Sequence, residues 1–372
     1  MMRKHVVLLL VVLVSVGLLV GSAGCDPSGE PAEGEMPKVV MAFTSEQPYL
    51  GHTPYFVADE LGYWEEEGIE VEFEWTAGSS QAIQLLGSGK VDFTAANHDA
   101  LIFANHKGAN MKSVFQEHTK CEFQFAVPKN SPIKKLEDLK GKKIGVSSMA
   151  SGFVPYAQAA FFEAGMDPEK DLNLLEVGSG SGAATAIESG EVDVLGLWEV
   201  AFANLENTLG HDYFRFITPP IYDRLTCNAI ITTDEIVNDN PEVVIGFLRG
   251  LSKGTVFLLN NPDAVIDIFY KNYPEAKPPG KDDETILKEA QHVLECENEQ
   301  RTNQNRPLEN PMGLWGYQIA AEFLEAQNVH IRIGTLDKEL PVDAFMTNDF
   351  IEEVNNFDEE AIINQAKEYT VD

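Results

Sequence analysis

The 372-residue sequence predicts an α/β fold of two similar lobes, each a doubly wound sheet with helices on both faces. Three features predict this architecture: a long internal repeat, an alternation of strand and helix patterns within each copy, and two extended segments that connect the copies. The two connecting segments predict a two-strand hinge, and lobes joined by a hinge enclose a cleft.

The internal repeat relates two segments that lie 101 positions apart. Residues 81–93 (QAIQLLGSGKVDF) align with residues 182–194 (GAATAIESGEVDV), and both contain Ser-Gly-x-Val-Asp. The same offset aligns Pro54 with Pro155. Because the match extends over a whole strand–helix–strand unit, each copy predicts one lobe.

Strand and helix patterns alternate within each copy. Residues 39–43 and 143–146 are short apolar runs typical of buried strands. Ile83 and Leu86 belong to an apolar helical face that ends at Gly87. Strands that alternate with helices imply right-handed crossovers and a largely parallel sheet.

Two extended apolar segments, residues 122–127 and 226–232, connect the copies and are predicted to form the hinge. Helices are expected in the return around residues 241–251, 264–270, 284–294 and 314–324. The expected organisation is a signal peptide at 1–24, a tether at 25–37, the first part of lobe 1 at 38–121, hinge strands and lobe 2 at 122–232, and the return to lobe 1 with C-terminal helices at 233–372.

The net charge restricts the possible partners. The chain has 59 acidic and 27 basic residues, for a formal net charge of -32. A surface of this sign repels nucleic acid and anionic lipid. The sequence therefore predicts no nucleic-acid partner.

The N-terminus carries export signals. Arg3 and Lys4 precede an apolar run that ends in small residues before Cys25, which is the pattern of a signal peptide. Small residues directly before a cysteine resemble the lipobox of bacterial lipoproteins, although Ser22 stands where that motif usually has leucine. We expect lipidation at Cys25 and anchoring to the outer face of the cytoplasmic membrane. A secreted form and an uncleaved anchor are the alternatives.

The remaining cysteines are Cys121, Cys227 and Cys296. No two of them have metal-ligand spacing, so we expect no metal site and no cofactor. Export permits one disulfide, and three buried thiols are the alternative that we favour.

The sequence resembles the substrate-binding proteins of ABC importers for nitrate, aliphatic sulfonates, taurine and hydroxymethylpyrimidine. Residues 54–71 (PYFVADELGYWEEEGIEV), 88–93 (SGKVDF) and 136–146 (LEDLKGKKIGV) carry this resemblance. Trp198-Glu199-Val200 is similar to a Trp-Asp/Glu-Pro motif of that family, with valine in place of proline. The resemblance implies the type II fold of periplasmic binding proteins, a small-molecule ligand, a permease and ATPase as partners, and a monomer.

Ligands of open parallel sheets bind at loops beyond the carboxyl ends of the strands. In both copies these loops contain Gly and Ser, whose backbone N–H groups at helix starts can donate to a ligand, although helix capping also explains them. The candidate ligand-binding residues are Glu46, Tyr49, His52, Ser79, Ser80, Asn97, His98, Asp99, Ser148, Ser151, Phe153, Ser181, Trp198 and Glu199.

The charges of these loops indicate the ligand class. Acidic residues and aromatic rings occur in them, whereas lysine and arginine do not. This pattern favours a cationic, zwitterionic or nitrogen-heterocyclic ligand over nitrate or a sulfonate. Arg301 and Arg306 in the return segment could reverse the preference by reaching the cleft.

Two other functional classes remain possible. One is an enzyme on the same fold, related to the pyrimidine synthases of thiamine biosynthesis, although their cysteine-rich signature is absent from this sequence. The other is an extracellular ligand sensor. Export with a lipid anchor favours the binding protein, and we therefore expect no enzymatic activity.

Overall fold

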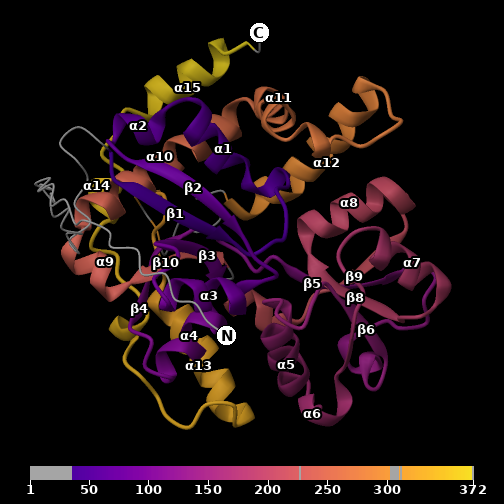
Figure 1. Cartoon of the computed structure of the whole chain (residues 1–372). Helices are drawn as coiled ribbons and strands as arrows, with labels where there is room; N and C mark the ends of the chain where they lie inside the picture. Colours follow the sequence, from indigo (N-terminus) through magenta and orange to yellow (C-terminus); the bar gives the residue numbers. More distant parts are fainter. Residues whose placement is uncertain (1–35, 226–227, 302–309, 311, 371–372) are drawn as a thin grey trace, which may run out of the picture. The chain divides into compact units, whose positions relative to one another are not determined.

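The computed structural model describes residues 36–225, 228–301, 310 and 312–370. Within them, two five-stranded sheets are present (Figure 1). We call the elements around the first sheet lobe 1 and the elements from β5 to η3 lobe 2. The strands of lobe 1 are β1 (Lys38–Phe43), β2 (Glu70–Trp75), β3 (Phe93–Asn97), β4 (Met111–Gln116) and β10 (Asn228–Thr233). The strands of lobe 2 are β5 (Phe123–Pro128), β6 (Lys143–Val146), β7 (Asn173–Glu176), β8 (Val194–Trp198) and β9 (Phe214–Ile217).

The two sheets have corresponding orders, β2-β1-β3-β10-β4 and β7-β6-β8-β5-β9. In each, the three strands of the repeat are parallel, and the connecting strand, β10 or β5, is antiparallel to its neighbours. The predicted fold class of two similar α/β lobes is therefore confirmed.

The aspartate of the repeated motif has the same structural role in both lobes. The carboxylate of Asp92 accepts a hydrogen bond of 2.7 Å from the backbone N–H of Val40, and that of Asp193 accepts one of 2.9 Å from Lys143. Each aspartate thus ties the start of the third strand of its copy to the start of the first. This contact explains why an aspartate occurs at both positions.

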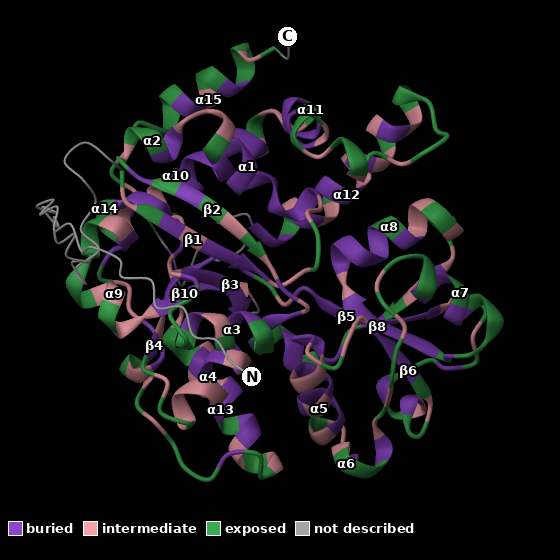
Figure 2. Cartoon of the chain, viewed as in Figure 1, coloured by how far each residue is buried: buried purple, intermediate pink, exposed green. Residues whose placement is uncertain are grey.

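Helices cover both faces of each sheet, and most of the strand residues between them are buried (Figure 2). In lobe 1, α1 and α10 pack together on one face, and α3 and α4 lie on the other. The helices of lobe 1 are η1 (Leu50–His52), α1 (Thr53–Glu60), α2 (Tyr63–Glu66), α3 (Ser79–Gly87), α4 (His98–His106), α9 (Asp234–Asp239), α10 (Pro241–Asn260), α11 (Pro262–Asn272), η4 (Pro274–Ala276), α12 (Asp283–Arg301), α13 (Ala320–Ile333), η6 (Val342–Ala344), α14 (Ile351–Val354) and α15 (Glu359–Glu368). Those of lobe 2 are η2 (Leu136–Leu139), α5 (Phe153–Glu163), α6 (Pro168–Asp171), α7 (Ser181–Ser189), α8 (Glu199–Leu209) and η3 (Pro220–Arg224).

The last predicted helix begins later than expected. Residues 314–319 are not helical, and α13 starts at Ala320. The backbone of Gly316 instead forms an isolated bridge with Gln116 at the end of β4, with a hydrogen bond of 2.8 Å. Gly316 has a φ of 79°, and a Cβ at this position would overlap the Phe115 ring, so the position favours glycine.

The predicted signal peptide and Cys25 lie outside the described residues, as do Cys227 and Arg306. Cys121 and Cys296 are half-buried, so the expectation of fully buried cysteines does not hold for these two. No described helix combines the length and the apolar composition needed to cross a membrane.

Candidate functional site

A cleft lies where the carboxyl ends of the parallel strands of the two lobes face each other. It has an inner part of about 30 Å³, enough for about one water molecule, and an outer part of about 460 Å³. The inner cleft is lined by Thr44, Ser45, Tyr49, Ala77, Gly78, Ser79, Asn97, Glu122, Phe123, Ser147, Ser151, Gly152, Trp198 and Asn228. The outer cleft is lined by Thr44, Ser45, Glu46, Gln47, Pro48, Tyr49, Ala77, Ser147, Ser148, Gly178, Ser179, Gly180, Ser181, Gly182, Trp198, Val200, Ala201 and Asn204.

Three amide and carboxylate side chains form the polar floor of the inner cleft. Asn97 Nδ2 lies 3.4 Å from both Glu122 Oε1 and Asn228 Oδ1, and Asn228 Nδ2 donates to Glu122 Oε2 at 3.2 Å. Ser79 Oγ donates to Asn97 Oδ1 at 2.6 Å. This network orients the Asn97 and Asn228 amides and the Glu122 carboxylate at the base of the cleft.

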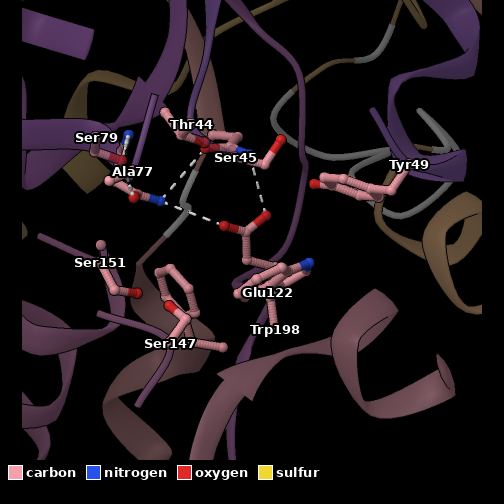
Figure 3. A pocket seen from close by; sticks show the side chains of 14 residues that line it. Thr44, Ser45, Tyr49, Ala77, Ser79, Glu122, Ser147, Ser151 and Trp198 are labelled. Carbon is pink, nitrogen blue, oxygen red and sulfur yellow. Dashed lines mark hydrogen bonds between the residues drawn. The ribbon is translucent and has the colours of Figure 1, made fainter. Parts of the chain in front are cut away.

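Two aromatic rings stand between the inner and outer cleft. The centroids of Tyr49 and Trp198 are 6.3 Å apart with an angle of 47° between the rings. Figure 3 shows the Tyr49 ring pointing towards the Glu122 carboxylate, which lies beside Trp198. The Trp198 indole N–H is buried and has no hydrogen-bond partner among the described residues, so it is available to a ligand acceptor. Burial and the charges of nearby glutamates raise the pKa of the Tyr49 phenol, which therefore stays protonated.

A buried cluster of charges lies behind the floor. His118 contacts Glu122 at 2.7 Å and Glu297 at 3.2 Å, and Arg301 contacts Glu297 at 2.6 Å and Glu117 at 2.8 Å. Burial opposes ionisation of His118, but the charge of Glu297 and the hydrogen bonds to both glutamates raise its pKa to about 10. The cluster therefore contains two cations that hold the carboxylates, including that of Glu122, in place.

Glu199, at the start of α8, adds a further carboxyl group to this region. Its side chain is buried, and burial together with the charges of Glu297 and Glu122 raises its pKa well above the ordinary value of 4.5. Glu297 keeps its charge because Arg301 and His118 overcome the cost of burial and lower its pKa. Burial beside Glu297 therefore favours the neutral, protonated form of the Glu199 side chain.

The two lobes touch directly around the cleft. Ser148 Oγ of lobe 2 donates to the backbone oxygen of Ala77 in lobe 1 at 3.1 Å. A methyl group at Gly152 would overlap the Asn97 amide oxygen, so the Asn97 side chain of lobe 1 can lie against this backbone of lobe 2 only because residue 152 is glycine. Helices α8 and α12 also pack against each other across the lobes. These contacts describe a closed arrangement.

Most candidates from the sequence line the cleft. Asn97 and Trp198, which are equivalent in the repeat, both line the inner cleft. The cleft-lining candidates are Glu46, Tyr49, Ser79, Asn97, Ser148, Ser151, Ser181 and Trp198. Their contact with a ligand stays a prediction.

The other candidates lie elsewhere. His98 stacks on Phe323 of α13 with ring centroids 3.9 Å apart, and Asp99 pairs with His330 of the same helix at 3.3 Å. Phe153 is fully buried in lobe 2, and Ser80 is exposed on α3 outside both parts of the cleft.

His52 and Glu199 sit behind the cleft wall. His52 packs against Tyr49 at a ring distance of 4.0 Å, and burial lowers its pKa to about 3, so it is neutral. Arg301 is buried in the charge cluster and does not line the cleft.

Sequence reasoning missed Glu122, Phe123 and Asn228, which line the inner cleft. All three belong to the segments that cross between the lobes, and we had assigned those segments a hinge role only. Because crossing segments run along the base of a cleft between lobes, polar residues in them are a usable signal for binding.

Several solved structures with this arrangement are named as binding proteins. The nitrate-binding protein NrtA from Synechocystis superposes with a TM-score of 0.63 at 13% identity, covering 91% of this chain and 99% of that protein. The alkanesulfonate-binding protein SsuA from Xanthomonas axonopodis superposes with a TM-score of 0.61 at 16% identity, covering 85% of this chain and all of that protein. The fold is that of the periplasmic binding proteins.

Sequence comparison identifies the family. The NMT1/THI5-like profile matches residues 50–265, and the chain belongs to this family. The riboflavin-binding protein RibY of Chloroflexus aurantiacus is 26% identical over 68% of this chain and 72% of its own length. The formylaminopyrimidine-binding protein of Halalkalibacterium halodurans is 27% identical over 75% of this chain and 80% of its own length. A 4-amino-5-hydroxymethyl-2-methylpyrimidine phosphate synthase of Legionella pneumophila is 26% identical over 62% of this chain and 72% of its own length. Most of the relatives found are named as binding proteins. The resemblance inferred from the sequence is confirmed, and the chain is a substrate-binding protein of the NMT1/THI5 type.

Proposed function

We propose that this chain is the exported substrate-binding component of an ABC importer and that its cleft binds a small nitrogen-containing heterocycle or organic cation. It acts as a monomer, is anchored through Cys25, and delivers the ligand to a permease driven by an ATPase. The fold, the family and the predominance of binding proteins among the relatives support this role.

The residues that line the cleft indicate the chemical class of the ligand. Among the described residues, no lysine or arginine lines the inner or the outer cleft. The inner cleft instead offers the carboxylate of Glu122 and the amides of Asn97 and Asn228. Amides and carboxylates can pair with the ring nitrogens and amino groups of a heterocycle, whereas a bare anion would meet the negative charge of Glu122.

The aromatic rings support a flat ligand. A planar ligand ring placed beside Trp198 would be stabilised by stacking. An acceptor atom on that ring could accept a hydrogen bond from the buried indole N–H. The outer cleft, at about 460 Å³, falls within the usual size range of small-molecule pockets. The names of two relatives, which bind riboflavin and formylaminopyrimidine, are consistent with a nitrogen heterocycle.

Titration calorimetry with a panel of compounds tests this proposal. The panel contains riboflavin, an aminopyrimidine, a quaternary amine, methanesulfonate and nitrate. We expect saturable binding of a heterocycle or a cation and none of nitrate or methanesulfonate. Binding of nitrate or methanesulfonate alone would contradict the proposed ligand class.

Trp198→Ala tests the position of the site with whichever compound binds. The variant should weaken binding by ~1–3 kcal/mol, by analogy with stacking on aromatic side chains. Trp315→Ala is the matched control, because Trp315 is also half-buried but lies outside the cleft. If Trp198→Ala lowered the melting temperature in proportion to the loss of affinity, Trp198 would be a packing residue only.

The alternative function is an enzyme with the same fold. One observation supports it, which is that one of the relatives is named as a pyrimidine phosphate synthase. An enzyme would convert the bound compound, and a binding protein would release it unchanged. Mass spectrometry of the compound after prolonged incubation with the protein separates the two.

A further inference from the structure

A second group of titratable side chains lies at the contact between α8 and α12, apart from the cleft. Glu206 belongs to α8, His211 follows that helix, and His292 belongs to α12. His292 Nε2 is 3.0 Å from Glu206 Oε2, and the His211 and His292 rings have centroids 4.5 Å apart. One donor atom from each of the three residues lies within 4.8 Å of the other two.

We propose that Glu206, His211 and His292 form a binding site for a divalent transition-metal ion of the Zn²⁺ type, with ligands from both lobes. Two imidazoles and one carboxylate are a common ligand set for Zn²⁺, with a fourth position left to water. The site goes beyond the proposed transport role, and it does not depend on the identity of the ligand in the cleft.

The geometry fits such an ion. With metal–ligand distances of about 2.0–2.1 Å, the donor atoms of a tetrahedral site lie about 3.3–3.4 Å apart. The separation of 3.0 Å between His292 and Glu206 is already close to this value. His211 is exposed, so its ring can rotate into place without disturbing the packing.

The local chain positions the ligands. Gly210 ends α8 with a φ of 106°, and its N–H donates to the Glu206 carbonyl at 2.8 Å. This turn places His211 next to the helix that carries Glu206. Across the contact, Asn207 Nδ2 donates to the backbone oxygen of Glu289 on α12 at 3.1 Å, which holds His292 opposite.

The position of the site has a thermodynamic consequence. Helix α8 belongs to lobe 2, whereas α12 also packs against α11 and η1 of lobe 1. All three ligands therefore meet only while α8 and α12 are in contact. A bound ion stabilises this contact, and closure of the lobes in turn strengthens ion binding.

Calorimetric titration of the full-length chain with Zn²⁺ tests the site. We expect one high-affinity Zn²⁺ and a rise in melting temperature that excess EDTA reverses. His211→Ala in lobe 2 and His292→Gln in α12 should each weaken Zn²⁺ binding at least about tenfold, since even loss of groups that only orient metal ligands costs about that much. His211→Ala removes an exposed side chain, so the fold should persist.

Two control variants sharpen the result. Glu295→Gln removes one nearby exposed negative charge without removing a proposed ligand, and it should leave Zn²⁺ affinity within twofold of the wild type. Cys296→Ser removes the thiol one turn along α12 from His292 and should also retain the ion. Unchanged affinity in either histidine variant, or binding that depends on Cys296 instead, would overturn the assignment.

Discussion

Replacing Glu199 by glutamine should stabilise the folded chain at neutral pH and have little effect in acid. Glutamine has the shape of a protonated glutamic acid, which is the form that burial beside Glu297 favours for the Glu199 side chain. When the wild-type chain unfolds, this side chain becomes solvated and ionises. The folded state must therefore hold a proton that the unfolded state releases.

The direction and the size of the stability difference follow from the linkage between proton binding and folding. Because the pKa of Glu199 is raised in the folded state, its contribution to stability is fully present below the unfolded pKa of 4.5 and is lost as the pH rises. The loss is about 1.4 kcal/mol for each pH unit above 4.5 over which the folded side chain keeps its proton. Glu199→Gln has no such loss. The difference in free energy of unfolding between the variant and the wild type should therefore increase with pH at the same slope.

Urea unfolding of both proteins from pH 5 to pH 8 measures the difference. Glu46→Gln is the matched control, because Glu46 is an exposed glutamate at the mouth of the cleft, and its curve should run parallel to that of the wild type. A constant difference between Glu199→Gln and the wild type across this range would refute the protonation of Glu199.

Three further predictions concern closure and anchoring. Gly152→Ala should force apart the contact with Asn97 and cost about 1–3 kcal/mol in the closed state, which calorimetry would detect as roughly 5- to 150-fold weaker ligand binding. Gly87→Ala on α3 is the control, because Gly87 does not line the cleft and its added methyl would meet only the end of the Met111 side chain, so this variant should bind normally. The predicted hinge at residues 122–127 and 226–232 requires a smaller radius of gyration with ligand than without it in X-ray scattering, and tight binding without this change would argue against the hinge. Cys25→Ala should release the protein from membranes, and mass spectrometry of the extracted wild type should find a lipid on Cys25 rather than an unmodified N-terminus at another residue.

The two-lobe fold was predictable because its signals are local and repeated. The Ser-Gly-x-Val-Asp motif occurs in both copies, and Asp92 and Asp193 make equivalent hydrogen bonds to the starts of β1 and β6. The start of α13 was not predictable in this way, because residues before it pair with the distant strand β4 through Gly316.

The candidate site was predictable only in part. Loops at the carboxyl ends of the strands were expected, and Asn97 and Trp198 do line one cleft. The neighbouring residues of the same loops turn away, since a residue that begins a helix after a strand faces a different direction from the residue before it. His98 thus reaches α13, and Glu199 lies against the charges of α12.

The sequence alone determined the repeat, the alternation of strands and helices, the family resemblance and the acidic charge, because each depends on residues close together or on composition. Tertiary structure decided which side chains meet. Glu122 and Asn228 are more than a hundred positions apart, yet they share a hydrogen bond at the floor of the cleft. His118 and Glu297, and likewise Glu206 and His292, are paired by the contact of α12 with lobe 2 and with the crossing segment. Pairings of this kind depend on how helices pack, and packing is set by the whole core and not by any local pattern.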